Sequence, residues 1–160
     1  MIQFRNISRV MIKVENLDRA IDFCEKVLGA KFFFKQERDP NSPSGMICAM
    51  STEPGLELME VVGDKGDLSM FHPHPNGAKM FEFIRDHAIG VVGFVIDMDG
   101  VEEARQAAAD LGVESKFEFN FSQEELNMLG WNYSKYLEYF LDPEKTDNTL
   151  FLISDFKTKE

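Results

Sequence analysis

The fold of this chain is decided by residues 9–29, which read RVMIKVENLDRAIDFCEKVLG. An apolar strand leads through a short turn into an amphipathic helix over residues 17–28, and Gly29 marks the point where that helix must stop. Residues 91–112, VVGFVIDMDGVEEARQAAADLG, repeat this plan, with a helix over 101–111 and a glycine at position 112. The doubled unit predicts two copies of one module around a shared cavity, with the chemistry on residues that face inward from both.

Each module continues with three more predicted strands, recognised as apolar segments between turn-rich stretches. In the first module they fall at residues 31–36, 46–50 and 56–62, and in the second at residues 113–121, 134–141 and 149–154. We therefore expect a single domain over residues 1–160. Its parts are a first βαβββ module at 1–64, a linker at 65–88 with a short helix near 78–86, and a second βαβββ module at 89–160.

The composition excludes several classes of function. A net charge of -11 argues against binding to nucleic acid or to an anionic membrane surface, because both would repel the chain. The only basic segment, at Lys31, Lys35 and Arg38, is weak, which also argues against a polyphosphate ligand. No apolar run is long enough to span a membrane, and two cysteines are too few for a disulfide scaffold. The N-terminal residues show no charged-then-apolar pattern, so we expect no secretion signal. A cytoplasmic protein is expected.

An aromatic-rich insertion lies near residues 117–140 of the second module and has no counterpart in the first. A capping box at Ser122 and Glu125 opens a short helix, and Trp131, Tyr133 and Tyr136 follow it. Two interpretations stay open at this point. The rings either pack the insertion against the rest of the chain, or they wall one end of the cavity and select a flat, apolar ligand.

These elements resemble the vicinal oxygen chelate (glyoxalase, bleomycin resistance and dioxygenase) superfamily, and the layout is most similar to its methylmalonyl-CoA epimerase branch. The matching segments are residues 10–29, 55–61 (GLELMEV), 78–104 and 141–153. The resemblance implies an α+β fold in which two βαβββ modules form an eight-stranded, cup-shaped mixed sheet with the helices outside.

The resemblance also implies four metal-ligand positions, two in each module, that usually hold His, Glu or Gln, His, and Glu. Carried over to this chain, they fall on Arg9, Glu57, Val91 and Leu152, and only Glu57 is a possible ligand. We therefore expect no metal and no other cofactor. His72 and His74 form a His-x-His pair among prolines, where histidines that pack within a loop or face solvent are more common than metal ligands.

Strand alternation predicts which side chains face the cavity. If Arg9 faces inward, Met11 and Lys13 do too, and the same reasoning selects Glu57, Met59, Val91, Gly93 and Leu152. Trp131, Tyr133, Tyr136, His72 and His74 complete the predicted substrate-binding set. Arg9 and Glu57 should be close enough to interact, either as an ion pair that holds two strands together or as an electrophile and a base.

Two functions from different classes follow. We favour an enzyme: a metal-independent isomerase, of the epimerase or racemase type, that abstracts a proton next to a carbonyl group in a mainly apolar or aromatic small molecule. Arg9 and Glu57 would be its catalytic residues. The alternative is a non-catalytic protein that binds or sequesters a drug or an aromatic ligand, because the fold alone does not separate the two. A homodimer is expected, since exposed strand edges favour pairing.

Overall fold

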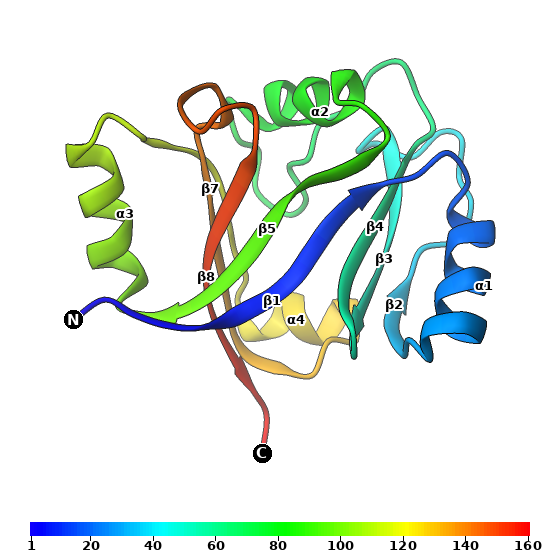
Figure 1. Ribbon diagram of the computed structural model, residues 1–160, viewed down its shortest axis with the longest axis horizontal. Helices are drawn as coiled ribbons and strands as arrows, with labels where there is room; N and C mark the ends of the chain where they lie inside the picture. The colour runs from blue at the N-terminus through cyan, green and yellow to red at the C-terminus, as the bar shows by residue number, and fades with distance from the viewer. The chain divides into compact units, whose positions relative to one another are not determined.

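The computed structural model describes residues 1–160 and shows a mixed sheet with helices (Figure 1). Its strands are β1 (Gln3–Lys13), β2 (Phe32–Lys35), β3 (Met46–Thr52), β4 (Gly55–Val61), β5 (Gly90–Asp99), β6 (Ser115–Asn120), β7 (Tyr133–Leu141) and β8 (Leu150–Thr158). Its helices are α1 (Leu17–Leu28), α2 (Gly77–Asp86), α3 (Val101–Asp110) and α4 (Gln123–Leu129), with a 3-10 helix at Pro143–Lys145. The eight strands run in the order β2-β3-β4-β1-β5-β8-β7-β6, which confirms the predicted α+β fold class.

The chain divides into two compact units, residues 9–92 and residues 1–8 with 93–160. Strand pairing follows the same pattern in both. In the first unit β1 is parallel to β4, and β4-β3 and β3-β2 are antiparallel. In the second unit β5 is parallel to β8, and β8-β7 and β7-β6 are antiparallel. The repeat predicted from residues 9–29 and 91–112 is therefore a repeat of strand pairing.

In the unit of residues 9–92, α1 packs on one face of the strands through its apolar side. Leu17, Ile21 and Cys24 are the buried helix residues, and they form one core with Ile47, Ala49 and Leu58 of β3 and β4. Since successive strand residues point to opposite faces, the side chains between these core positions lie on the face away from α1.

The ends of α1 are set by the two residues expected to set them. Asn16 lies in extended backbone and its side chain accepts a hydrogen bond of 2.8 Å from the Arg19 N–H. Gly29 adopts a left-handed conformation, with φ of 69°, and its N–H donates to the Cys24 carbonyl. The helix predicted over residues 17–28 is confirmed.

Helix α2 confirms the short helix predicted near residues 78–86, and it buries Met80, Phe81 and Ile84. Its Phe81 ring lies against the turn before β3, where a Cβ atom on Gly45 would come within 2.5 Å of the ring. Gly45 also has a φ of +71°, so both the space and the backbone require glycine there.

In the unit of residues 1–8 and 93–160, α3 packs on one face of β7 and β8. The core between them contains Met98, Val101, Leu137, Tyr139, Leu141 and Ile153. The capping box at Ser122 is present and begins α4, as predicted. None of the helices combines the length and the apolar character that a membrane span requires.

Candidate functional site

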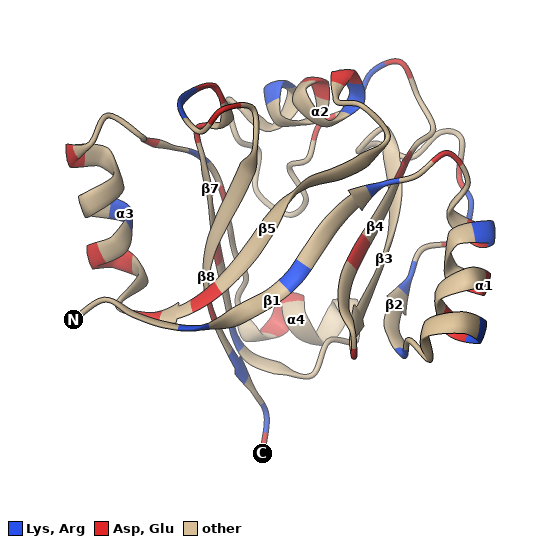
Figure 2. Cartoon of the chain, in the orientation of Figure 1, with Lys and Arg blue, Asp and Glu red and all other residues tan.

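Buried charged residues are few, and they are the natural place to look for function. Most charged positions lie on helices and turns, while the strands are largely uncharged (Figure 2). The buried charged residues are Arg9, Glu60, Asp97 and Glu138, which lie on strands, and Asp142, which follows β7. Burying a charge is costly unless it is paired, so each needs a structural or a chemical reason.

Arg9 and Glu57 form an ion pair within the unit of residues 9–92. Arg9 Nε lies 3.2 Å from Glu57 Oε2, and the two side chains are 2% and 16% exposed. The strand register accounts for the contact: Met11 of β1 is the partner of Glu57 on β4, and Arg9 lies two residues before Met11 on the same face. The two side chains expected to interact are therefore in direct contact.

The register also fixes the neighbours of Glu57 on this face. Met11 on β1 and Met50 on β3 are both partners of Glu57, so they lie on either side of it. In the next row Met59 is paired with Cys48 on one side and with Lys13 on the other. Met11, Met50 and Met59 are 1%, 4% and 0% exposed, so the carboxylate lies among buried thioethers.

Cys48 lies close enough to Arg9 and Glu57 for both charges to affect the pKa of its thiol. Burial raises the pKa of its thiol well above the usual range, the Glu57 carboxylate adds to that rise, and the Arg9 guanidinium opposes it. The thiol therefore stays neutral near pH 7 and is a poor nucleophile. Cys24, in the α1 core, also has a pKa raised by burial, as expected for a core thiol.

Lys13, predicted to line the substrate site, holds α2 in place. Its Nζ donates to the carbonyl oxygens of Arg85, at 2.5 Å, and of His87, at 2.7 Å, where α2 ends. A cation at the carbonyl end of a helix is favourable because the last carbonyls have no partner within the helix. We assign Lys13 to the support of α2, a use of its charge that the sequence did not indicate.

The register of the second unit corrects one position carried over from the family. Leu152 is paired with Val95 as Glu57 is paired with Met11, so the equivalent of Arg9 is two residues before Val95, at Gly93. The sequence had placed it at Val91, which is 51% exposed. A Cβ atom at position 93 would lie 1.9 Å from the Leu150 carbonyl oxygen, so this strand position accepts only glycine.

The corrected set of four positions is Arg9, Glu57, Gly93 and Leu152. One carboxylate, one guanidinium, one residue without a side chain and one aliphatic chain do not make a ligand set for a divalent cation. No group of three or more His, Cys, Asp or Glu side chains is arranged to hold a metal ion. The residues present do not fit the metal of the family.

The two linker histidines lie in a turn before α2. His72 is exposed, whereas His74 is partly buried and its Nδ1 lies 3.1 Å from the Asn76 N–H, which donates to it. His74 N–H donates in turn to the Ser69 hydroxyl, at 3.0 Å. These contacts show His74 as part of the local structure of the turn.

The three predicted aromatic residues belong to one cluster of rings in the second unit. Trp131 and Tyr136 are 6% and 2% exposed, and their ring centroids are 5.0 Å apart. Tyr133 contacts Tyr136 at 5.2 Å, and Phe121 stacks on Tyr136 at 5.5 Å. The rings therefore pack against one another within this unit.

Glu138 is the most deeply buried of the four buried carboxylates, none of which the sequence singled out. Glu138 on β7 is 2% exposed and is the register partner of Ser154 on β8. Leu137 and Tyr139 belong to the α3 core, so alternation places Glu138 on the other face. The signal was present in the sequence, because Glu138 interrupts an otherwise apolar strand segment, 136–141 (YLEYFL).

Comparison with known proteins agrees with this architecture. A family model described as the Glyoxalase/Bleomycin resistance protein/Dioxygenase superfamily matches residues 6–120. No curated protein sequence matches the chain.

Solved structures match over nearly the whole chain. Methylmalonyl-CoA epimerase from Mycobacterium tuberculosis is 15% identical with a TM-score of 0.61, and the match covers 96% of this chain and 89% of that one. Hypothetical protein BH1468 from Bacillus halodurans C-125 is 16% identical with a TM-score of 0.62, covering 97% and 96%. Methylmalonyl-CoA epimerase in complex with methylmalonyl-CoA and NH4+ is 16% identical with a TM-score of 0.61, covering 96% and 94%. At such identities the likeness shows a shared fold.

Proposed function

Since the chain belongs to the Glyoxalase/Bleomycin resistance protein/Dioxygenase superfamily, we propose that it is a metal-independent isomerase of the epimerase or racemase type. Its substrate is a mainly apolar carbonyl compound, and its reaction is the removal and return of a proton on the carbon next to that carbonyl. Glu57 is the base and Arg9 is the electrophile. Solved epimerases of the same fold support the reaction type.

The observation that carries the proposal is the Arg9–Glu57 pair. Two positions that hold metal ligands in the family hold instead a buried guanidinium and a carboxylate, 3.2 Å apart. A guanidinium stabilises an oxyanion by donating hydrogen bonds to it, where a metal ion would do so through its charge. The guanidinium also stays charged at every working pH. The pair therefore offers both of the groups that enolate formation needs.

The proposed reaction has two steps. The substrate carbonyl oxygen accepts a hydrogen bond from the Arg9 guanidinium, while the Glu57 carboxylate takes the proton from the neighbouring carbon. The electron pair of that C–H bond moves into the carbonyl group and gives an enolate, whose oxygen Arg9 stabilises. A water molecule on the opposite face donates a proton to the same carbon and gives the epimer, and Glu57 then releases the abstracted proton, which neutralises the hydroxide formed from that water. No oxidant or reductant is required.

The comparisons suggest a carbonyl substrate, and the charges of the chain argue against a coenzyme A ester. Lys35 and Arg38, two members of the basic segment, are held by Glu25 and by Glu60, respectively. Cations already engaged in ion pairs are poor partners for a polyphosphate group. We therefore limit the proposal to small carbonyl compounds without such a group.

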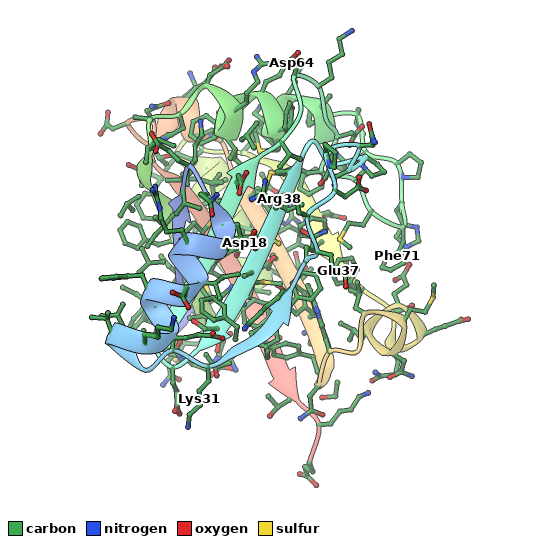
Figure 3. The ribbon with its side chains drawn as sticks, turned by 90° about the vertical axis from the view of Figure 1, so that its right-hand side faces the viewer. Asp18, Lys31, Glu37, Arg38, Asp64 and Phe71 are labelled. Atoms are coloured by element: carbon green, nitrogen blue, oxygen red, sulfur yellow. The ribbon has the colours of Figure 1, made fainter.

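Solvent exchange tests this function directly. In D2O, the wild-type protein should catalyse deuterium incorporation at the carbon next to the carbonyl of a chiral ketone, together with loss of optical activity. Glu57→Gln keeps the shape and hydrogen bonding but removes the base, so exchange should fall by at least about 100-fold. Glu37→Gln, which alters an exposed carboxylate of the same unit (Figure 3), is the matched control and should exchange at the wild-type rate.

The alternative is a non-catalytic binding protein, and the ring cluster around Trp131 and Tyr136 is the observation in its favour. Such aromatic groups bind flat ligands without any need for a base. This reading predicts tight binding of planar aromatic compounds by calorimetry, with no deuterium incorporation into any carbonyl compound. Exchange that depends on Glu57 excludes it.

A further inference from the structure

Sulfur is distributed unevenly between the two faces of the strands in the unit of residues 9–92. The core under α1 contains one cysteine, Cys24, and no methionine, and its other buried residues are alanine, leucine and isoleucine. On the opposite face, which carries Arg9 and Glu57, alternation places four methionines and one cysteine: Met11, Met46, Met50, Met59 and Cys48. Apolar burial alone does not require this difference, because the four methionines are as deeply buried as the residues of the α1 core.

The methionines that matter lie next to the proposed base. Met11 and Met50 are the register partners of Glu57 on its two sides, and Met59 is two residues further along β4. All three are at most 4% exposed. A group whose proton Glu57 removes must therefore lie among these thioethers. Methionine has three rotatable bonds, so such side chains can move to admit a ligand.

Thioethers favour one class of ligand group in particular. A sulfur about 5 Å from an aromatic ring makes a favourable contact with it, whereas a saturated ring of the same size gains only apolar burial. Flexible methionines also adapt to the flat shape of a ring. A face lined in this way favours an aryl group beside the base.

The chemistry of the pair points to the same group. A carboxylate is a weak base, and one guanidinium is a modest electrophile for an enolate. An aromatic ring on the carbon that loses its proton delocalises the negative charge and lowers the demand on both. The methionines beside Glu57 and the reactivity of the pair therefore both favour an aromatic ring on the carbon that loses its proton.

We propose that the substrate is a carbonyl compound with an aromatic ring on the proton-donating carbon, and that Met11, Met50 and Met59 determine this specificity. The inference rests on the proposed isomerase function and names its substrate class. It adds three specificity-determining residues to the catalytic pair.

Three ketones separate the contributions of ring and acidity. The first is 3-phenylbutan-2-one; 3-cyclohexylbutan-2-one matches its size without aromaticity; 3-methyl-4-phenylbutan-2-one keeps the ring but moves it one carbon away. Deuterium incorporation at the chiral carbon is measured in D2O and divided by the uncatalysed rate for each ketone. The phenyl ketone should exceed the cyclohexyl ketone by about ten-fold or more in kcat/KM, with the third compound between them. Equal values for all three overturn the inference.

Variants test the named residues. Met50→Leu and Met59→Leu nearly conserve volume and remove the sulfur, so they should fold and lose about two- to ten-fold of the preference for phenyl over cyclohexyl, mainly through KM. Met98→Leu, at a buried methionine in the α3 core, is the matched control and should keep the full preference. An unchanged preference in both Met50→Leu and Met59→Leu, or an equal loss in Met98→Leu, contradicts the assignment.

A binding measurement distinguishes failure of this inference from failure of the proposed function. With methyl-13C-methionine, acetophenone should shift the signals of Met11, Met50 and Met59 but leave that of Met98 in place. If these signals shift and no ketone exchanges, the isomerase function fails while the aromatic site stands. If all ketones exchange equally and only the signal of Met98 or none shifts, the isomerase stands and the aromatic specificity fails.

Discussion

The carboxylate of Glu60 on β4 accepts a hydrogen bond of 2.6 Å from the backbone N–H of Leu17, the first residue of α1. Arg38 holds the same carboxylate with both guanidinium nitrogens, at 2.7 and 2.8 Å, and lies 3.6 Å from Asp18 (Figure 3). The positive end of the helix is thus fixed to the strand that also carries Glu57. The start of α1 and the position of the proposed base depend on one strand.

Glu60→Gln should lower the free energy of unfolding by about 1–3 kcal/mol. The variant loses charge-assisted hydrogen bonds at a side chain that is 8% exposed, where the remaining donors stay buried. Urea denaturation followed by circular dichroism measures this. Glu25→Gln, at the more exposed ion pair with Lys35, should change the value by no more than about 0.5 kcal/mol. Equal losses in both variants would show that Glu60 has no special role.

The contacts of the Glu60 carboxylate also predict that the free energy of unfolding depends on pH. Hydrogen bonding from Arg38 holds the pKa of Glu60 below its usual range, burial opposes this, and the Leu17 N–H adds to the lowering. A group with a lowered pKa contributes stability above its unfolded pKa, and that contribution is lost as the pH falls through the lowered value in the folded state. The difference in unfolding free energy between wild type and Glu60→Gln should therefore be largest near pH 7 and shrink below about pH 4. A difference that grows on acidification would contradict it.

Helices could be predicted closely because local signals set their ends. Asn16 and Gly29 bracket α1 as expected, and the capping box at Ser122 begins α4. Helix α3 ends at Asp110, one residue short of the prediction, with Gly112 at a φ of 82°. Caps and glycines act within a few residues, so the sequence contains all the information that they need.

Strand ends were less predictable because their partners are distant. β1 begins at Gln3, well before the apolar segment at residue 9, and Arg5 in this extension is held by Asp155, at 2.6 Å, and by Asp97, at 3.2 Å. β8 likewise continues to Thr158, past the predicted end at residue 154. A polar strand is stabilised by its neighbours rather than by its own pattern, so only the fold reveals it.

Part of the candidate site could be predicted from the sequence, and part could not. Proximity of Arg9 and Glu57 followed from two parallel strands in a family register, and the 3.2 Å contact agrees. The choice of partner by Lys13 was not predictable, because its carbonyl acceptors lie on a helix far along the chain. The family position equivalent to Arg9 falls on Gly93 rather than on Val91, because the register of β5 is fixed by its pairing with β8. The local sequence does not specify that register.

We expect the purified protein to carry no stoichiometric transition metal. The four family ligand positions hold Arg9, Glu57, Gly93 and Leu152, and a guanidinium beside the single carboxylate repels a cation. Elemental analysis by plasma mass spectrometry should give well below about one zinc, iron, nickel or cobalt per chain, and Glu57→Ala should not change it. About one metal per chain, lost in Glu57→Ala, would refute the expectation.

We also expect a homodimer that uses the outer flank of α1. Contacts of Glu25 with Lys35 and of Asp18 with Arg38 turn one flank of α1 toward β2 and the segment that follows it. Phe23 and Val27 lie on the other flank, where they are 55% and 63% exposed. Both charge signs occur along this helix (Figure 2), so the same patch on a second copy can complement it. Sedimentation should show twice the 18.3 kDa of one chain, and Phe23→Glu should give a monomer.

Leu111→Glu is the control for this interface, since Leu111 is 83% exposed and lies in the other unit. It should leave the dimer intact. Dissociation by Leu111→Glu and not by Phe23→Glu would place the interface elsewhere, and a monomeric wild type at micromolar concentration would exclude the dimer.

Arg9 variants separate the catalytic role of the pair from its structural one. Arg9→Met should lower exchange by about 100- to 1000-fold, as loss of an oxyanion donor does, and Arg9→Lys should restore only part of it, because a point charge lacks the planar fork. Arg9→Met alone also leaves the Glu57 charge unpaired and should cost about 3–5 kcal/mol of stability. The double variant Arg9→Met with Glu57→Gln should recover most of that stability by urea denaturation, yet remain inactive. If every variant exchanges as fast as the wild type, the pair only holds the strands together, and the base must be sought elsewhere, first at His72 and His74.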